Sequence, residues 1–284
     1  MPKLLWTLIV VAIIIPLCIV LFGRTTLNEA IAGLNAPQVM TTPVEKPKPI
    51  EQPTVIEKPA QKKTPKKEPA KKKVVKKKRQ PKPVIVIDPS HQQFKDVSLE
   101  RVAPNSNVKR AKQLASATGV VTAQKEYHVT MTMAKKLRTQ LEKKGYKVVF
   151  TRSKHDVQLS NRARAKRANK SDAQLVISLH ADGGKYYQRG FYVMTASKKA
   201  TPKYYKQSKR QAKRIVNAVA KHDKIFSPGQ FEREDITLFN YAKAPAVSIQ
   251  LGFLTNVKDD RKLANDKYLE TLAKWIAAGV KPVK

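Results

Sequence analysis

Residues 84–92 read VIVIDPSHQ, and this stretch decides the fold. Four consecutive β-branched residues come first, and Asp88 follows them. A short apolar run of this kind is typical of a strand that is buried on both faces, as the strands of parallel sheets are. We therefore predict that residues 84–88 form an inner strand, with Asp88 and His91 at its carboxyl end.

Strand and helix patterns alternate along the rest of the chain. Further strands are predicted at 147–151, 174–180, 190–196 and 246–251, and helices at 128–144, 158–170, 203–221 and 266–280. The arginine-rich helix at 158–170 is expected on the surface. This alternation predicts an α/β fold in which helices cover both faces of one sheet. In such sheets, sites form where strands end.

Polar side chains stand at several of these ends. His91 follows the first strand, His180 ends the run LVISLH, Gln250 lies in SIQLGFLTN, and Glu126 opens the first helix. Two imidazoles and one carboxylate suit zinc and leave a fourth tetrahedral position open for water. Thiolate ligands are not expected, because Cys18 is the chain's one cysteine. Spacing alone leaves open that each histidine is an ordinary hydrogen-bonded residue.

From Val84 to the C-terminus the chain resembles the zinc-dependent N-acetylmuramoyl-L-alanine amidases of the amidase-3 family. The matching stretches, in the family's order, are VIVIDPSHQ, KEY (125–127), KKLRTQLEKKGYKVVFTR (135–152), LSNRARAKRAN (159–169), DAQLVISLHAD (172–182), RGFYV (189–193) and APAVSIQLGFLTN (244–256). The resemblance implies a twisted mixed β-sheet flanked by helices. It implies hydrolysis of the amide between the lactyl group of muramic acid and L-alanine in peptidoglycan. It also implies that His91, Glu126 and His180 bind Zn²⁺.

The chain departs from the family pattern in two places. DPSHQQ (88–93) stands where Asp-Pro-Gly-His-Gly-Gly is usual, although His91 is kept. Gln250 occupies the position of the family's catalytic glutamate, which takes a proton from the zinc-bound water and later delivers one to the leaving amine. A glutamine side chain does not titrate, but it can donate and accept hydrogen bonds.

Three functions follow from these observations. The first is an active amidase, with weakened activity or with another carboxylate as the base; Glu232, Glu234 and Asp235 are the candidates. The second is an inactive pseudo-amidase that binds peptidoglycan and regulates wall hydrolysis. The third is a basic nucleic-acid-binding protein. We expect no nucleic-acid partner, because the lysine-rich run 71–79 has no interleaved aromatic residues for base stacking.

The N-terminus carries an uncharged apolar run. Residues 4–22 are long enough to span a bilayer core of about 30 Å. We expect residues 1–24 to be an uncleaved membrane anchor, because the run exceeds the usual apolar region of a signal peptide and the small-residue site AIA (30–32) lies beyond it. A cleaved secretory signal is the alternative. Both interpretations place the following residues outside the cytoplasm.

Residues 36–83 are rich in lysine and proline, contain no aromatic residue and no glycine, and carry a net charge of +11. A segment of this composition cannot bury enough apolar surface to fold, so we expect a disordered tether before a catalytic domain at 84–284. Lys and Arg outnumber Asp and Glu by 57 to 21 in the whole chain, which indicates polyanionic surroundings. With the resemblance, these features imply a protein of the Gram-positive wall, held to anionic wall polymers by its tether.

Overall fold

The computed structural model describes residues 81–282. The expected anchor at 1–24 lies outside the described residues, as does almost all of the expected tether at 36–83. Within 81–282, no helix is both long enough and apolar enough to cross a membrane. The domain predicted from residue 84 onward is described except for its last two residues.

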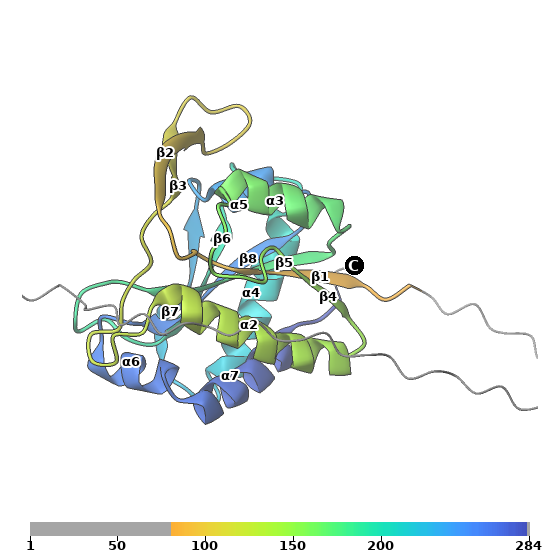
Figure 1. Ribbon diagram of the computed structural model, residues 1–284. Helices are drawn as coiled ribbons and strands as arrows, with labels where there is room; N and C mark the ends of the chain where they lie inside the picture. The colour runs from red at the N-terminus through yellow and green to blue at the C-terminus, as the bar shows by residue number, and fades with distance from the viewer. Residues whose placement is uncertain (1–80, 283–284) are drawn as a thin grey trace, which may run out of the picture. The chain divides into compact units, whose positions relative to one another are not determined.

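A twisted six-stranded sheet forms the centre of the domain (Figure 1). Its order is β4-β1-β5-β8-β6-β7, with β1 at Val84–Pro89, β4 at Lys147–Phe150, β5 at Leu175–Asp182, β6 at Phe191–Ala196, β7 at Ile225–Arg233 and β8 at Ala246–Phe253. Strands β4, β1, β5 and β8 are parallel, whereas β6 runs antiparallel to β8 and parallel to β7. The sheet is therefore mixed, and β1 is an inner strand as predicted.

Helices cover both faces of the sheet, which confirms the predicted α/β class (Figure 1). Helices α2 (Glu126–Lys143), α4 (Tyr205–Val219) and α7 (Asp266–Gly279) contribute to the core on one face, and α3 (Asn161–Lys170) and α5 (Thr237–Tyr241) to the core on the other. The short helix α6 (Val257–Leu263) follows β8. Successive side chains of β8 point alternately to these two faces, because a β-strand is pleated.

The sequence prediction omits several elements. Strands β2 (Asp96–Arg101) and β3 (Lys109–Gln113) form a separate antiparallel hairpin, which Figure 1 shows standing away from the main sheet. The sequence of β3, KRAKQ, has no apolar alternation from which a strand could be predicted. Strand β7 contains a proline and a glycine, which argue against a strand in sequence. The helices α5 and α6 are too short for a clear periodicity.

The predicted surface helix at 158–170 is only partly correct. Arg162 and Lys166 are exposed, but Arg164 is 1% exposed and lies against the sheet with Ala165 and Ala168. The prediction took every arginine for a solvated side chain, because a buried one requires an acidic and polar partner set from elsewhere in the chain.

Candidate metal centre at the carboxyl edge of the sheet

Three polar side chains from separate elements meet where β1 and β5 end. His91 follows β1, His180 lies near the end of β5, and Glu126 is the first residue of α2. Their nitrogen and oxygen atoms lie within 4.8 Å of one another. His91 Nε2 is 3.3 Å from Glu126 Oε2, and His180 Nδ1 is 3.1 Å from Glu126 Oε1. The structure thus brings together the three residues that the sequence singles out for a metal.

The Glu126 carboxylate is buried but well supplied with donors. The backbone N–H groups of Ala117 and Ala181 donate to it, each at 3.1 Å. Burial alone would raise its pKa, but the neighbouring His91 and His180 imidazoles and the backbone donors hold the pKa of Glu126 below its ordinary value. Its place at the start of α2 also favours a negative charge, because the helix dipole is positive there. Glu126 is therefore a carboxylate at neutral pH.

His91 is oriented by its backbone and by one hydrogen bond. Its φ of 56° lies in the left-handed region, which is uncommon for a residue with a side chain. Its Nδ1 is 3.2 Å from the carbonyl oxygen of Leu114, and because a carbonyl only accepts, Nδ1 is the donor. Nε2 is then the acceptor, and it faces Glu126. Burial lowers the pKa of His91 and favours the neutral imidazole, which is the form that binds metals.

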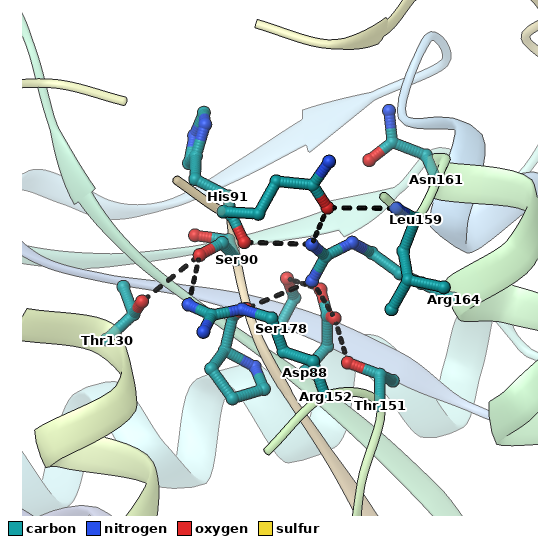
Figure 2. Close-up of polar contacts among 12 residues, drawn as sticks. Asp88, Ser90, His91, Thr130, Thr151, Arg152, Leu159, Asn161, Arg164 and Ser178 are labelled. Carbon is teal, nitrogen blue, oxygen red and sulfur yellow. Dashed lines mark hydrogen bonds and ion pairs between the residues drawn. The ribbon is translucent and has the colours of Figure 1, made fainter. Parts of the chain in front are cut away.

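A buried ion pair lies next to the loop that carries His91 (Figure 2). Arg164 Nη1 donates to Asp88 Oδ1 at 2.9 Å, and the Asp88 carboxylate also accepts hydrogen bonds from the hydroxyl groups of Thr151 and Ser178. Burial opposes the charge on Asp88, but Arg164 and the two hydroxyl donors outweigh it and lower the pKa of Asp88. Both members of the pair are almost fully inaccessible to solvent, so their charges depend on each other.

Two arginines use their remaining donors on the backbone of the loop after β1 (Figure 2). Arg164 donates to the carbonyl oxygens of Pro89 at 3.0 Å and His91 at 2.8 Å. Arg152 donates to the carbonyl oxygens of Pro89 at 2.8 Å and Ser90 at 3.1 Å. Burial, together with the charge of Arg164, lowers the pKa of Arg152 to about 10, so it remains charged at neutral pH. These contacts hold the loop in the shape that presents His91.

Gln92, one of the departures from the family motif, belongs to the same network. Its Oε1 accepts hydrogen bonds from Arg164 Nη2 at 3.0 Å and from the backbone N–H of Leu159 at 3.1 Å. Its Nε2 donates to the carbonyl oxygen of Phe94 at 3.2 Å. The larger side chain at this position therefore adds contacts that hold the loop.

Gln250 lies in β8, directly opposite His180 in the register of β5 and β8. It is 4% exposed and points away from Ile249 and Leu251, which pack in the core on the opposite face. Its Nε2 donates to Ser248 Oγ at 3.3 Å, whereas its Oε1 has no hydrogen-bond partner among residues 81–282. A buried polar atom of this kind requires a partner, which a ligand or a water molecule could supply.

The cluster and Gln250 line one cleft of about 740 Å³. Further polar side chains that sequence reasoning did not assign to the site also line it: Arg110, Asp182, Tyr192 and Arg233. Asp182 carries the clearest sequence signal, because it follows His180 by two residues on the same strand and so points to the same side. The Tyr192 hydroxyl donates to its carboxylate. The arginines come from β3 and β7, which the sequence does not predict.

The candidate replacement bases differ in position. Glu232 binds Lys209 and Glu234 binds Lys199, and neither carboxylate lines the cleft. Asp235 lines the cleft. Hydrogen bonds from Arg233 lower the pKa of Asp235, which makes it a weak proton acceptor.

The profile of the family Amidase_3, described as N-acetylmuramoyl-L-alanine amidase, matches residues 85–282, and the chain belongs to this family. One relative is the N-acetylmuramoyl-L-alanine amidase Rv3717 of Mycobacterium tuberculosis, which is 25% identical over 209 residues, covering 68% of this chain and 85% of that protein. Another is the protein YqiI of Bacillus subtilis, 26% identical over 161 residues, covering 55% of this chain and 72% of that protein.

Solved structures share the fold. The amidase Ami1 of Mycobacterium smegmatis superposes with a TM-score of 0.62 at 22% identity, covering 69% of this chain and 94% of that chain. The catalytic domain of CwlV from Bacillus (Paenibacillus) polymyxa var. colistinus superposes with a TM-score of 0.54 at 22% identity, covering 69% and 95%. The sheet and helices described above are thus the family's architecture.

We predict that Arg164→Leu destabilises the protein by about 3–5 kcal/mol, because it leaves the Asp88 charge buried without its partner. Arg164→Lys should restore only part of the loss, because an ammonium cannot reproduce the guanidinium fork. Denaturant unfolding of the purified variants measures the change. Lys166→Leu, an exposed change on the same helix, is the control and should stay within about 0.5 kcal/mol of the parent. Equal effects of Arg164→Leu and Lys166→Leu would contradict the assigned role.

Proposed function

We propose that this chain is a zinc-dependent N-acetylmuramoyl-L-alanine amidase that cleaves the amide between the lactyl group of muramic acid and L-alanine in peptidoglycan. The observation that carries the proposal is the meeting of His91, Glu126 and His180 in the cleft of an Amidase_3 domain. Relatives with a named activity are amidases, which favours catalysis over the pseudo-amidase alternative.

The residues present fit a zinc ion. The donor set is two imidazoles and one carboxylate, and the surroundings of the buried Glu126 lower its pKa and favour the charged form. His91 is turned by its bond to Leu114 so that Nε2 is available as a ligand atom. A zinc ion held by these three side chains would lower the pKa of water toward neutrality and polarise the scissile carbonyl.

Gln250 limits the acid–base catalysis that the protein's own side chains can supply. Its free Oε1 can accept a hydrogen bond from a water molecule or from the substrate N–H, and so position either of them. It cannot take up a proton and pass it to the leaving amine. Loss of a positioned acid–base group typically costs about 10²–10⁴ in rate, so we propose a working but slow amidase.

Metal content tests the first part of the proposal. We expect one zinc ion per folded chain after reconstitution, and little or none in His91→Ala or His180→Ala, because each variant loses a ligand. Elemental analysis of protein purified without a metal-binding tag gives the stoichiometry. His222→Ala, which removes an exposed histidine outside the cleft, is the matched control and should bind as the parent does. Folded parent protein that holds no zinc would rule out the metalloenzyme.

Amidase activity tests the role of Gln250. We expect slow dye release from labelled cell walls by the parent, and a rise of at least about tenfold in Gln250→Glu, because the nearly isosteric acid restores a proton acceptor. Gln250→Ala is the control, since it removes the amide without adding an acid and should not raise the rate. If Gln250→Glu is slower than a fully active parent, another carboxylate is the base, and Asp235→Asn then tests the member of the Glu232, Glu234 and Asp235 set that lines the cleft.

The N-terminal segments bear on where the protein is held in the cell. We propose that residues 4–22 anchor the protein in the membrane and that residues 36–83 hold it to anionic wall polymers outside the cytoplasm. The support is the uncharged apolar run and the +11 charge of the lysine-rich segment.

We expect sedimentation with walls that carry teichoic acid to weaken as salt rises, because added ions screen exposed charges. Replacing residues 36–83 by a neutral Gly/Ser segment with the same number of residues keeps the contour length and removes the charge, so it should lower binding at low salt. Equal, salt-insensitive binding of both forms would reduce the segment to a spacer.

A further inference from the structure

An acidic residue between two arginines lies in the cleft that holds the candidate metal centre. Arg110, from the β2–β3 hairpin, places Nη2 at 2.6 Å from Asp235 Oδ2. Arg233, at the end of β7, donates from Nε at 2.8 Å and from Nη2 at 2.7 Å to the same carboxylate. All three residues line the cleft. Asp235 neutralises one of the two guanidinium charges, and Asp182, which accepts a hydrogen bond from the Tyr192 hydroxyl, offsets Arg233 from farther away; among the described residues Asp182 forms no ion pair with either arginine.

The two arginines also keep donors for a ligand. Among residues 81–282, no recorded hydrogen bond uses Nη1 of Arg233, or Nε and Nη1 of Arg110. The side chains are about half exposed, at 46% for Arg233 and 55% for Arg110. Asp235 meanwhile fixes the direction of both guanidinium groups. A guanidinium group that is charged, held in one orientation and has N–H donors without a partner is suited to bind a second carboxylate.

We propose that Arg110 and Arg233 form a subsite for a free carboxylate of the peptide on the amine side of the scissile bond. The proposal rests on the proposed function. In a muramoyl peptide the lactyl carboxyl is consumed in the amide, so the carboxylates nearest the scissile bond belong to the peptide. The subsite would select stems whose acidic group is free over stems in which it is amidated.

Binding of two matched ligands tests the subsite. Both are muramoyl dipeptides whose scissile amide is replaced by a trans-alkene, so neither is hydrolysed; the second amino acid carries a free carboxylate in one and a carboxamide in the other. Calorimetry with the zinc-loaded full chain at low salt should show about tenfold or more tighter binding of the free acid, as expected for a charge-assisted hydrogen bond.

Variants then locate the effect. Arg233→Gln and Arg110→Gln should each weaken binding of the free acid and leave the carboxamide ligand nearly unchanged. Arg210→Gln, which removes the same charge from the exposed side of α4, should preserve the preference. The ratio of the two affinities does not depend on the fraction of folded protein, so a purely structural role of either arginine would lower both signals without changing the ratio.

The outcomes separate the two proposals. Equal affinity of the parent for both ligands, or a preference that survives in both arginine variants, would overturn the carboxylate subsite and leave the proposed function standing. Failure of the folded, zinc-loaded parent to bind either ligand would overturn the subsite, whereas the proposed function would be overturned by the absence of dye release from labelled walls by both the parent and Gln250→Glu.

Discussion

The buried ion pair between Asp88 and Arg164 is the interaction on which the candidate site depends. A buried pair adds little net stability, because both charges lose their hydration, but each charge is costly without the other. The value of this pair lies in geometry. Arg164 is held by Asp88 and also donates to the carbonyl oxygens of Pro89 and His91 and to the Gln92 amide oxygen. The left-handed backbone of His91 is thus stabilised by contacts outside the loop.

The order of the strands explains why the rest of the site forms there. β1, β5 and β8 are consecutive and parallel in the sheet, so their carboxyl ends share one edge. His91 and His180 stand at this edge, and the register of β5 and β8 puts Gln250 beside His180. Glu126 comes from α2, whose N-terminus reaches the same edge. The hairpin β2–β3 then supplies one wall of the cleft through Arg110.

Gln250 changes the chemistry of the cleft without changing its shape. An acid at this position would be a second carboxylate facing the candidate metal residues, whereas the amide leaves Glu126 as the carboxylate within that cluster. The positive charge at Arg110 and Arg233 lies in the same cleft and is only partly offset by Asp235. The cleft therefore combines a position for a metal, an uncharged hydrogen-bonding group and a region suited to an anion.

The sequence by itself determined the α/β class, the inner strands and the residues that meet at the sheet edge. It could do so because buried parallel strands are continuous apolar runs, and because His91, His180 and Gln250 interrupt or end such runs. The match of these runs to a known family indicated their roles. Only the tertiary structure decided which polar residues are buried, because the burial of an arginine depends on partners that lie far away in the chain.

Arg164 shows this most clearly. Its carboxylate partner, Asp88, is 76 residues away, and the arginine-rich sequence of its helix predicts a solvent-exposed helix. The hairpin β2–β3 and the contact of Arg110 with Asp235 could not be predicted from the sequence either, because β3 (KRAKQ) has no apolar alternation and the contact joins distant segments. The hydrophobic periodicity of a segment indicates its secondary structure and which of its faces is buried. Charge pairs and register are set by which segments become neighbours, and that is decided when the sheet assembles.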